Sequence, residues 1–287
     1  MGSNTSVSCT FWGVRGSVPC PYPTHMAFGG NTTCVQIALP DADELLILDS
    51  GTGIRKLGEK LARQNHPQRG HVFISHPHWD HLQGFPFFRP FFSDENHFTI
   101  HMPRQKLGGC RDILNSYHGQ TFFPVSLDML KANLDFVDQP QELRTYGSYG
   151  VEYMRANHGA RTAIYKLHFN GKTLVFAPDN ELVSEKYAKN TSWVDTFTTF
   201  IVGADLLIHD AQYDLESYGN RQGWGHSPWQ EVARVAAGHN VKRLALMHHD
   251  PGATDAKLLH RQEQLQRSYG DAFIDVRLVR EGETIVI

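Results

Sequence analysis

Three histidines and an aspartate lie within six positions of the chain, directly after an apolar run. They are His76, His78, Asp80 and His81, and the run before them is Val72-Phe73-Ile74. Imidazole nitrogens and carboxylate oxygens are typical ligands of divalent metals, and one ion seldom takes four ligands from so short a segment. The spacing therefore predicts a metal-binding loop at a strand end, shared between two ions. Because the chain has 17 histidines in 287 residues, a group of unrelated surface histidines is the alternative.

Four more segments place an aspartate or a histidine after a strand-like run. Asp49 follows Leu46-Ile47-Leu48, His158 lies in Asn157-His158-Gly159, Asp179 follows Val175-Phe176-Ala177-Pro178, and His248 follows Leu244-Ala245-Leu246-Met247. The H-x-H-x-D-H spacing and the order of these four segments resemble the signature of the metallo-β-lactamase superfamily. That resemblance implies an α/β fold, a four-layer αββα sandwich.

The resemblance also implies a ligand set for two ions. His76, His78 and His158 would hold one ion, Asp80, His81 and His248 the other, and Asp179 would bridge them. A bridging carboxylate and a shared hydroxide offset the repulsion between two cations about 3.5–4 Å apart, and the hydroxide can attack an electrophile. Seven nitrogen and oxygen ligands favour Zn²⁺, with Mn²⁺ or iron as alternatives.

Two residues beside these ligands have other expected roles. Asp49 is expected to orient a ligand from behind rather than to bind an ion. His249 directly follows His248, and the sequence leaves open whether it contacts substrate, orients Asp250 or lies at the surface.

Such a site predicts hydrolysis, and three features of the sequence narrow the choice of the bond that is hydrolysed. None of the four cysteines lies at a ligand motif, which argues against lactams. The segment after His248 has no room for the C-terminal helical domain of glyoxalase II enzymes, which argues against thioesters. His209-Asp210-Ala211 and Gly225-His226-Ser227 resemble elements of the ribonuclease Z branch, which cleaves phosphodiesters.

His226 is the predicted general acid for that cleavage. The alkoxide leaving group of a phosphodiester is poor, so an imidazolium oriented by Asp210 would protonate it. The family has Glu where Asp210 stands, which leaves the reach of this pair open. The alternative is a local structural role, in which Ser227 caps the helix that begins at Pro228. We name His226, Asp210 and Asp80 as the catalytic residues.

Three further features favour a small substrate. Ribonuclease Z proteins carry a long arm between the third histidine and the bridging aspartate, whereas here a tight hairpin at Asn170-Gly171 fills the interval from His158 to Asp179. The net charge is −3, so no basic field exists to hold a long nucleic acid. The motifs Trp12-Gly13-Val14-Arg15-Gly16-Ser17 and His248-His249-Asp250-Pro251 resemble bacterial hydrolases that are likened to class II cyclic nucleotide phosphodiesterases.

The sequence thus predicts a dinuclear metal-dependent phosphodiesterase that cleaves a small, cyclic nucleotide-like phosphodiester. The first alternative is a lactone or other carboxylic ester hydrolase with the same metals. The second is a non-catalytic ligand-binding or regulatory module that kept the fold.

The elements that position these residues alternate between strands and helices. Expected strands are 7–12, 34–39, 45–48, 206–208 and 283–287. Three helices are expected: one begins at Gly53, one begins at Pro228, and the last spans 255–269. The phenylalanine-rich stretch 84–92 contains two prolines, which exclude a regular helix. We expect it to form a loop wall beside the metals, where a ring could stack on a base or sugar. Core or dimer packing is the alternative for most of its rings.

Composition places the chain in a broad class. With 40% hydrophobic residues it can bury a sizeable core, and residues 1–287 are predicted to form a single domain. Scattered cysteines indicate reduced thiols, and we see no signal peptide and no apolar window long enough for a membrane span. We therefore expect a cytoplasmic protein, without a membrane partner, that can form a homodimer.

Overall fold

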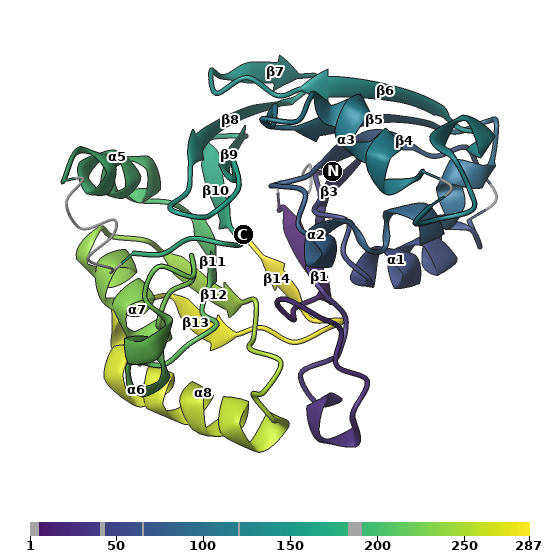
Figure 1. The fold of residues 1–287 in the computed structure, drawn as a ribbon. Coiled ribbons are helices and arrows are strands. Elements are labelled where there is room, and N and C mark those ends of the chain that lie inside the picture. The colour runs from purple at the N-terminus through teal and green to yellow at the C-terminus, as the bar shows by residue number, and fades with distance from the viewer. Residues whose placement is uncertain (1–5, 41–43, 65, 120, 183–190) are drawn as a thin grey trace.

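Two seven-stranded sheets form the centre of the computed structural model, which describes residues 6–40, 44–64, 66–119, 121–182 and 191–287 (Figure 1). The strands of the first sheet, in spatial order, are β14 (Thr284–Val286), β1 (Ser8–Gly13), β2 (Cys34–Ala38), β3 (Leu45–Leu48), β4 (Arg69–Phe73), β5 (His97–Met102) and β6 (Asn133–Asp138). Strands β3 to β6 are parallel, whereas β14, β1 and β2 are antiparallel to their neighbours.

The second sheet repeats this mixture of parallel and antiparallel pairs. Its order is β13 (Asp275–Leu278), β12 (Arg243–Met247), β11 (Leu206–Asp210), β10 (Lys172–Ala177), β9 (Ala163–Phe169), β8 (Tyr149–Arg155) and β7 (Arg144–Tyr146). Strands β10 to β13 are parallel, and β7 to β10 form an antiparallel meander. The closing strand, β14 of the first sheet, was predicted, whereas β5 and the short β13 were missed.

Helices cover the outer face of each sheet, so the molecule has four layers. The helices are α1 (Gly53–Leu61), α2 (Trp79–Leu82) and α3 (Cys110–Tyr117) on the first half, and α5 (Thr191–Ile201), α6 (Leu215–Tyr218), α7 (Trp229–Gly238) and α8 (Asp255–Tyr269) on the second. Buried side chains of both sheets, such as Phe11, Phe73 and Phe176, pack together between them. Separate apolar clusters join each sheet to its own helices. The predicted αββα sandwich is confirmed.

The hairpin predicted at Asn170-Gly171 is present between β9 and β10. Both turn residues have positive φ, 47° for Asn170 and 74° for Gly171, as a type I′ turn requires. The turn brings β10 back antiparallel to β9, and β10 leads directly to Asp179. The interval between His158 and Asp179 is therefore closed by a compact hairpin.

The phenylalanine-rich stretch forms two 3₁₀ helices, η2 (Phe85–Phe87) and η3 (Arg89–Phe92). Phe85, Phe88 and Phe91 are fully buried in the apolar cluster beneath α1. Their rings make tilted or edge contacts with one another, with centroids 4.7–4.8 Å apart. These three rings therefore pack in the core.

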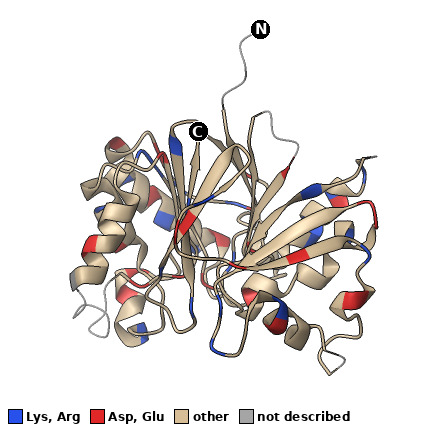
Figure 2. Cartoon of the chain, turned by 90° about the horizontal axis from the view of Figure 1, so that it is seen from above, with Lys and Arg blue, Asp and Glu red and all other residues tan. Residues whose placement is uncertain are grey.

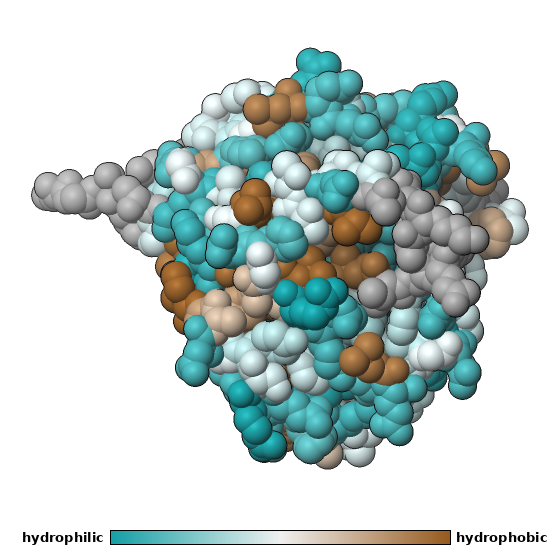
Figure 3. All heavy atoms as spheres, turned by 90° about the vertical axis from the view of Figure 1, so that its left-hand side faces the viewer, coloured by the Kyte–Doolittle hydropathy of each residue, from teal (hydrophilic) through white to brown (hydrophobic). Residues whose placement is uncertain are grey.

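The surface carries both signs of charge over both halves of the molecule (Figure 2). The face over α5, α6 and α7 is mostly hydrophilic, with small groups of hydrophobic side chains (Figure 3). Within the described residues, no helix combines the length and apolar character needed to cross a bilayer.

Candidate metal centre

The predicted ligands meet at one edge of the molecule, where the parallel strands of both sheets end. His76, Asp80 and His81 follow β4, Asp179 follows β10, and His248 follows β12. His158 comes from the loop after β8. His248 has a φ of 59°, so the chain turns sharply at the end of β12 and the imidazole points back toward the edge. Both halves of the sandwich thus contribute to a single site.

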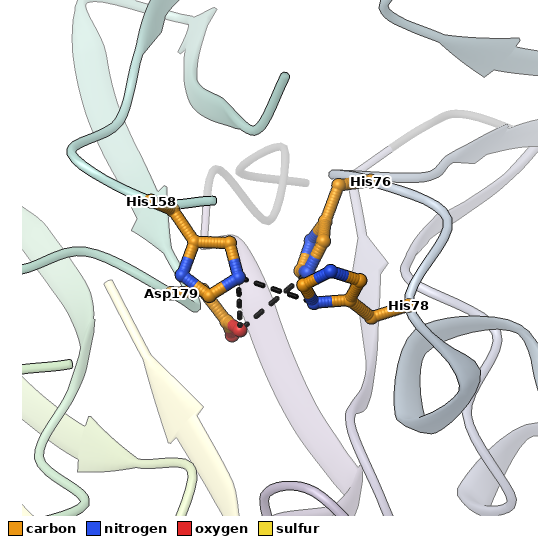
Figure 4. A group of neighbouring side chains, drawn as sticks. All are labelled: His76, His78, His158 and Asp179. Atoms are coloured by element: carbon orange, nitrogen blue, oxygen red, sulfur yellow. Dashed lines mark hydrogen bonds and ion pairs between the residues drawn. The ribbon is translucent and has the colours of Figure 1, made fainter. Parts of the chain in front are cut away.

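A first cluster gathers His76, His78, His158 and Asp179 (Figure 4). Asp179 Oδ2 lies 3.5 Å from Nε2 of His76 and 3.5 Å from Nε2 of His158. His158 Nε2 lies 3.1 Å from His78 Nδ1. The three imidazoles and one carboxylate oxygen therefore point toward a common centre.

A second cluster gathers Asp80, His81, His248 and the other oxygen of Asp179. Asp179 Oδ1 lies 3.2 Å from His81 Nε2 and 3.1 Å from His248 Nε2. Asp80 Oδ2 lies 3.3 Å from His81 Nε2 and 3.0 Å from His248 Nε2. The two oxygens of Asp179 thus face two different clusters, which is the geometry of a bridging carboxylate.

The spacing of these donor atoms fits metal ions. Ligands about 2.0–2.1 Å from a tetrahedral zinc ion stand roughly 3.3 Å from one another, and the distances within the two clusters are 3.0–3.5 Å. Within the described residues, the buried atoms His76 Nε2, His81 Nε2 and Asp179 Oδ1 have no hydrogen-bond partner. Buried polar atoms normally have one, and metal ions bound at the two clusters would supply the missing partners.

The protonation states of the first cluster suit metal binding, whereas in the second cluster Asp80, Asp179 and Asp49 outweigh burial and raise the pKa of His81. Burial lowers the pKa of His76, His78 and His158, that of His158 to about 4, so these imidazoles are neutral and free to donate a lone pair. Burial alone would raise the pKa of Asp179, but the nearby His248, His81 and His76 outweigh it and hold that pKa well below its ordinary value. Asp179 is therefore an anion.

Hydrogen bonds to the ring nitrogens that face away from the two clusters fix the orientation of the ligands. Asp49 Oδ2 accepts from His81 Nδ1 at 2.7 Å, and its other oxygen accepts from the Ser75 amide at 2.6 Å. His158 Nδ1 donates to the Gly225 carbonyl at 3.0 Å. A Cβ on Gly225 would lie 2.2 Å from that imidazole, so this close approach needs a glycine. Asp49 lies behind His81, where it was expected.

His226 and Asp210 form a pair at the rim of the second cluster. His226 Nδ1 lies 3.0 Å from Asp210 Oδ2, so the aspartate reaches the imidazole despite its shorter side chain. Burial disfavours the imidazolium, but Asp210 outweighs it and raises the pKa of His226 to about 9. His226 also lies near Asp179 and His248, but Asp80, His81, His248 and Asp179 already give the second cluster the four donors that zinc usually takes. We therefore do not count His226 as a ligand.

Ser227 does not cap the following helix. Its hydroxyl donates to the Asn180 carbonyl at 2.6 Å and accepts from the Leu182 amide at 3.0 Å. The residue before α7 is Pro228, which offers no side-chain cap. These two hydrogen bonds instead connect the turn that contains His226 with the segment that follows Asp179.

His249 is not at the surface, where one of the alternatives placed it. Its side chain is fully buried, its Nε2 donates to the Val279 carbonyl at 2.9 Å, and its ring packs edge-on against Phe28. Burial lowers its pKa to about 3. An enclosed, neutral imidazole cannot contact substrate, so His249 belongs to the core.

Three residues at the site were not identified from the sequence. The Ser17 amide donates to Asp80 Oδ2 at 2.7 Å. Glu181 is fully buried and accepts from the Tyr218 hydroxyl and from the amides of Gly223 and Gly225, at 2.6–2.7 Å. It thereby holds the loop that carries His226. Trp79, between two ligands, is 71% exposed. Each had a local signal, since Ser17 ends the motif 12–17, Trp79 stands between two ligands and Glu181 lies two positions after Asp179.

A cleft of about 380 Å³ opens above the two clusters. It is lined by Ser17, Pro77, His78, Trp79, Asp80, Asp179, His226 and His248. No phenylalanine of the described chain is among these residues. The phenylalanine-rich stretch therefore does not form the wall beside the metals, and that prediction is wrong. Phe85, Phe88 and Phe91 pack in the core beneath α1, and the partly exposed Phe87 and Phe92 do not line this cleft.

Comparisons with known proteins agree with this geometry. The model of the family described as "Beta-lactamase superfamily domain" matches residues 45–249. Ribonuclease Z of Natronomonas pharaonis is 23% identical over 325 residues, covering 98% of each chain. A solved diphosphatase from the PhnP family has a TM-score of 0.69 at 14% identity, covering 98% of this chain and 97% of that one. Yeast PDE1 has a TM-score of 0.68 at 14% identity, covering 99% and 100%.

The αββα layers and the two facing clusters of imidazole and carboxylate ligands define the class of metallo-hydrolases. The family match extends over more than half of the chain and includes every predicted ligand. The chain belongs to the metallo-β-lactamase superfamily.

Proposed function

We propose that this protein is a dinuclear metal-dependent phosphodiesterase that cleaves a small, cyclic nucleotide-like phosphodiester. The observation that carries the proposal is the His226–Asp210 pair, because an acid at the rim of the metal cleft is what a poor alkoxide leaving group requires. The hydrolysis of a carboxylic ester or lactone depends less on a general acid. The names of the similar proteins, a ribonuclease and a diphosphatase among them, also favour phosphate chemistry.

The ligand set suits two divalent ions, with Zn²⁺ as our first choice. When bound, such a pair supplies a hydroxide at neutral pH and offsets negative charge on a phosphoryl group. His76, His78 and His158 would hold one ion, Asp80, His81 and His248 the other, and Asp179 would contact both.

The chain's own residues supply the proton and the geometry. Asp210 accepts the Nδ1 proton of His226, which leaves Nε2 as the nitrogen that can donate to a leaving oxygen in the cleft. The Ser17 amide and Asp80 act together, since the amide fixes the carboxylate at the cleft wall. Glu181 keeps the His226 loop against the site through Gly223 and Gly225.

We propose a small substrate rather than a long nucleic acid. The β9–β10 hairpin closes the interval in which ribonuclease Z proteins carry an arm, and the net charge of −3 offers no general attraction to a polyanion. All four cysteines are free and buried, which suits a reducing, cytoplasmic setting. We also propose that residues 1–287 form a single domain and that the protein forms a homodimer.

A substrate panel on metal-loaded protein tests the proposal. A phosphodiesterase should cleave bis(p-nitrophenyl) phosphate and a cyclic mononucleotide and be silent on homoserine lactones. The reverse pattern would favour a lactone or carboxylic ester hydrolase with the same metals. Metal-loaded protein that is inert on every ester would favour a non-catalytic binding or regulatory module.

A further inference from the structure

A second, larger cavity lies beside the metal cleft. It measures about 520 Å³, and most of its wall is apolar, contributed by α2 and the residues beside it, by the loop before α3, by α3 and by the segment after α3. Pro77 and Trp79 line both this cavity and the metal cleft. The two spaces are therefore adjacent, with one proline and one tryptophan as their common wall.

Large apolar side chains are left in solvent around this cavity. Trp79 is 71% exposed, Leu107 is 91% exposed and Phe122 is 77% exposed. Single exposed apolar residues are ordinary, but three around one cavity form a patch of the kind that marks a binding site. A ligand that covered them would remove apolar area from water, which favours binding.

The position of Trp79 is tightly constrained. It stands between His78 and Asp80, whose side chains take part in the two metal clusters. It also begins α2, and its carbonyl accepts from the Gln83 amide at 2.7 Å. The backbone that carries the indole is thus held by the same loop that holds the ligands, which keeps Trp79 in the wall of the metal cleft.

One polar group in the cavity wall lacks a partner. The side-chain oxygen of Gln83 is buried, and no hydrogen bond to it is found among the described residues. A carboxamide at the edge of an apolar wall can exchange hydrogen bonds with the heteroatoms of a planar base, as pockets for small ligands commonly do.

We propose that this cavity is the subsite for a planar aromatic ring of the nucleobase type, carried by the phosphodiester whose phosphate lies in the metal cleft. The inference rests on the proposed function and names its substrate class, a nucleoside phosphodiester. Trp79 and Phe122 provide the faces for the ring. The volume lies within the range of small-molecule pockets, roughly 300–1,000 Å³, and continuity with the metal cleft favours a substrate over a second copy of the chain.

Two substrates with the same leaving group test the subsite. Thymidine 5′-(p-nitrophenyl phosphate) carries a base, whereas methyl p-nitrophenyl phosphate does not. We expect the wild-type enzyme to prefer the nucleoside diester in kcat/KM by roughly five- to one-hundred-fold, the range for stacking one base on an aromatic side chain. Phe122→Ala and Trp79→Leu should each lower this ratio roughly five-fold or more. Because the readout is a ratio, a change in metal content affects both substrates alike.

Phe92→Ala is the matched control, since Phe92 is also exposed, at 42%, but does not line the cavity. It should leave the ratio unchanged. An unchanged ratio in both Phe122→Ala and Trp79→Leu would overturn the subsite. So would an altered oligomeric mass of these variants in sedimentation with an unchanged ratio, which would make the cavity an interface between copies.

A binding measurement separates the subsite from the proposed function. If wild-type protein hydrolyses neither diester, the proposed phosphodiesterase activity fails, and calorimetric titration with thymidine 5′-monophosphate decides the subsite alone. Binding by wild type that weakens at least five-fold in Phe122→Ala supports it. Absent or equal binding overturns it.

Discussion

Replacing Asp210 by asparagine tests the general acid through its pKa. Asp210 Oδ2 accepts from His226 Nδ1 at 3.0 Å, while Asp210 Oδ1 accepts from the Gln212 amide at 2.8 Å. In the Asp210→Asn variant the carboxamide oxygen can keep the second bond, but the charge that faces His226 is lost. A hydrogen bond to a charged group contributes about 1.5–3 kcal/mol. At about 1.36 kcal/mol per unit, the pKa of His226 should fall by roughly one to two units.

The sign of the effect follows from the role of the proton. Only protonated His226 can assist the leaving group, so activity is lost as pH rises through the pKa of His226. Asp210 raises that pKa, to about 9 without metal ions, and nearby cations would lower it in both proteins. Asp210→Asn should therefore shift the alkaline limb of the pH profile of kcat/KM by roughly one to two units toward acid.

The assay compares two substrates at equal metal content. With a cyclic mononucleotide, whose leaving group needs a proton, the alkaline limb should shift and kcat/KM near pH 8 should fall about ten- to one-hundred-fold. With bis(p-nitrophenyl) phosphate, whose leaving group is already good, the variant should lose much less. An alkaline limb that stays in place, or equal losses on both substrates, would refute the role of this pair.

Three further predictions concern His226, Asp49 and His101. His226→Ala should retain its metals and lose rate most on the cyclic mononucleotide; equal losses on both substrates would contradict the assignment. Asp49→Ala removes the acceptor of His81 Nδ1 and the Ser75 amide. It should weaken metal binding about ten- to one-hundred-fold and destabilise the fold by about 3 kcal/mol, checked by metal titration and urea unfolding. Burial lowers the pKa of His101 to about 3, so its protonation favours the unfolded chain, and stability should fall as pH drops below about 6.5. His101 should contribute about 2 kcal/mol to the loss between pH 7 and 5, so the loss should be smaller by about that amount in His101→Gln.

The ligands could be identified from the sequence because each follows a strand. Parallel strands of one sheet end at a common edge, so the residues after β10 and β12 were expected to lie close together. β4 belongs to the other sheet, and only the family resemblance predicted that its ligands lie beside them. Local patterns also sufficed for the Asn170-Gly171 turn and for the helix Asp255–Tyr269. In each case a short-range rule of backbone geometry decides the outcome.

The sequence could not show which side chains the packing encloses. His248 and His249 are adjacent and chemically identical, yet one faces the ligands and the other packs against Phe28. The strand motif identified His248 as the ligand, but it could not show that His249 is enclosed, since that depends on elements far away in the chain. The same reason explains why Phe85 was expected beside the metals, whereas it is buried beneath α1, and why the exposed Trp79 was overlooked.

The central claim is that side chains from both sheets hold two neighbouring cations bridged by Asp179. Metal analysis of purified wild-type protein and Asp179→Ala by mass spectrometry, after exhaustive dialysis against trace metal, tests it most directly. The account predicts two ions per chain in the wild type and fewer than one in the variant, because Asp179 Oδ1 and Oδ2 each face one cluster. A wild type that binds no ion, or a variant that keeps both, would contradict it.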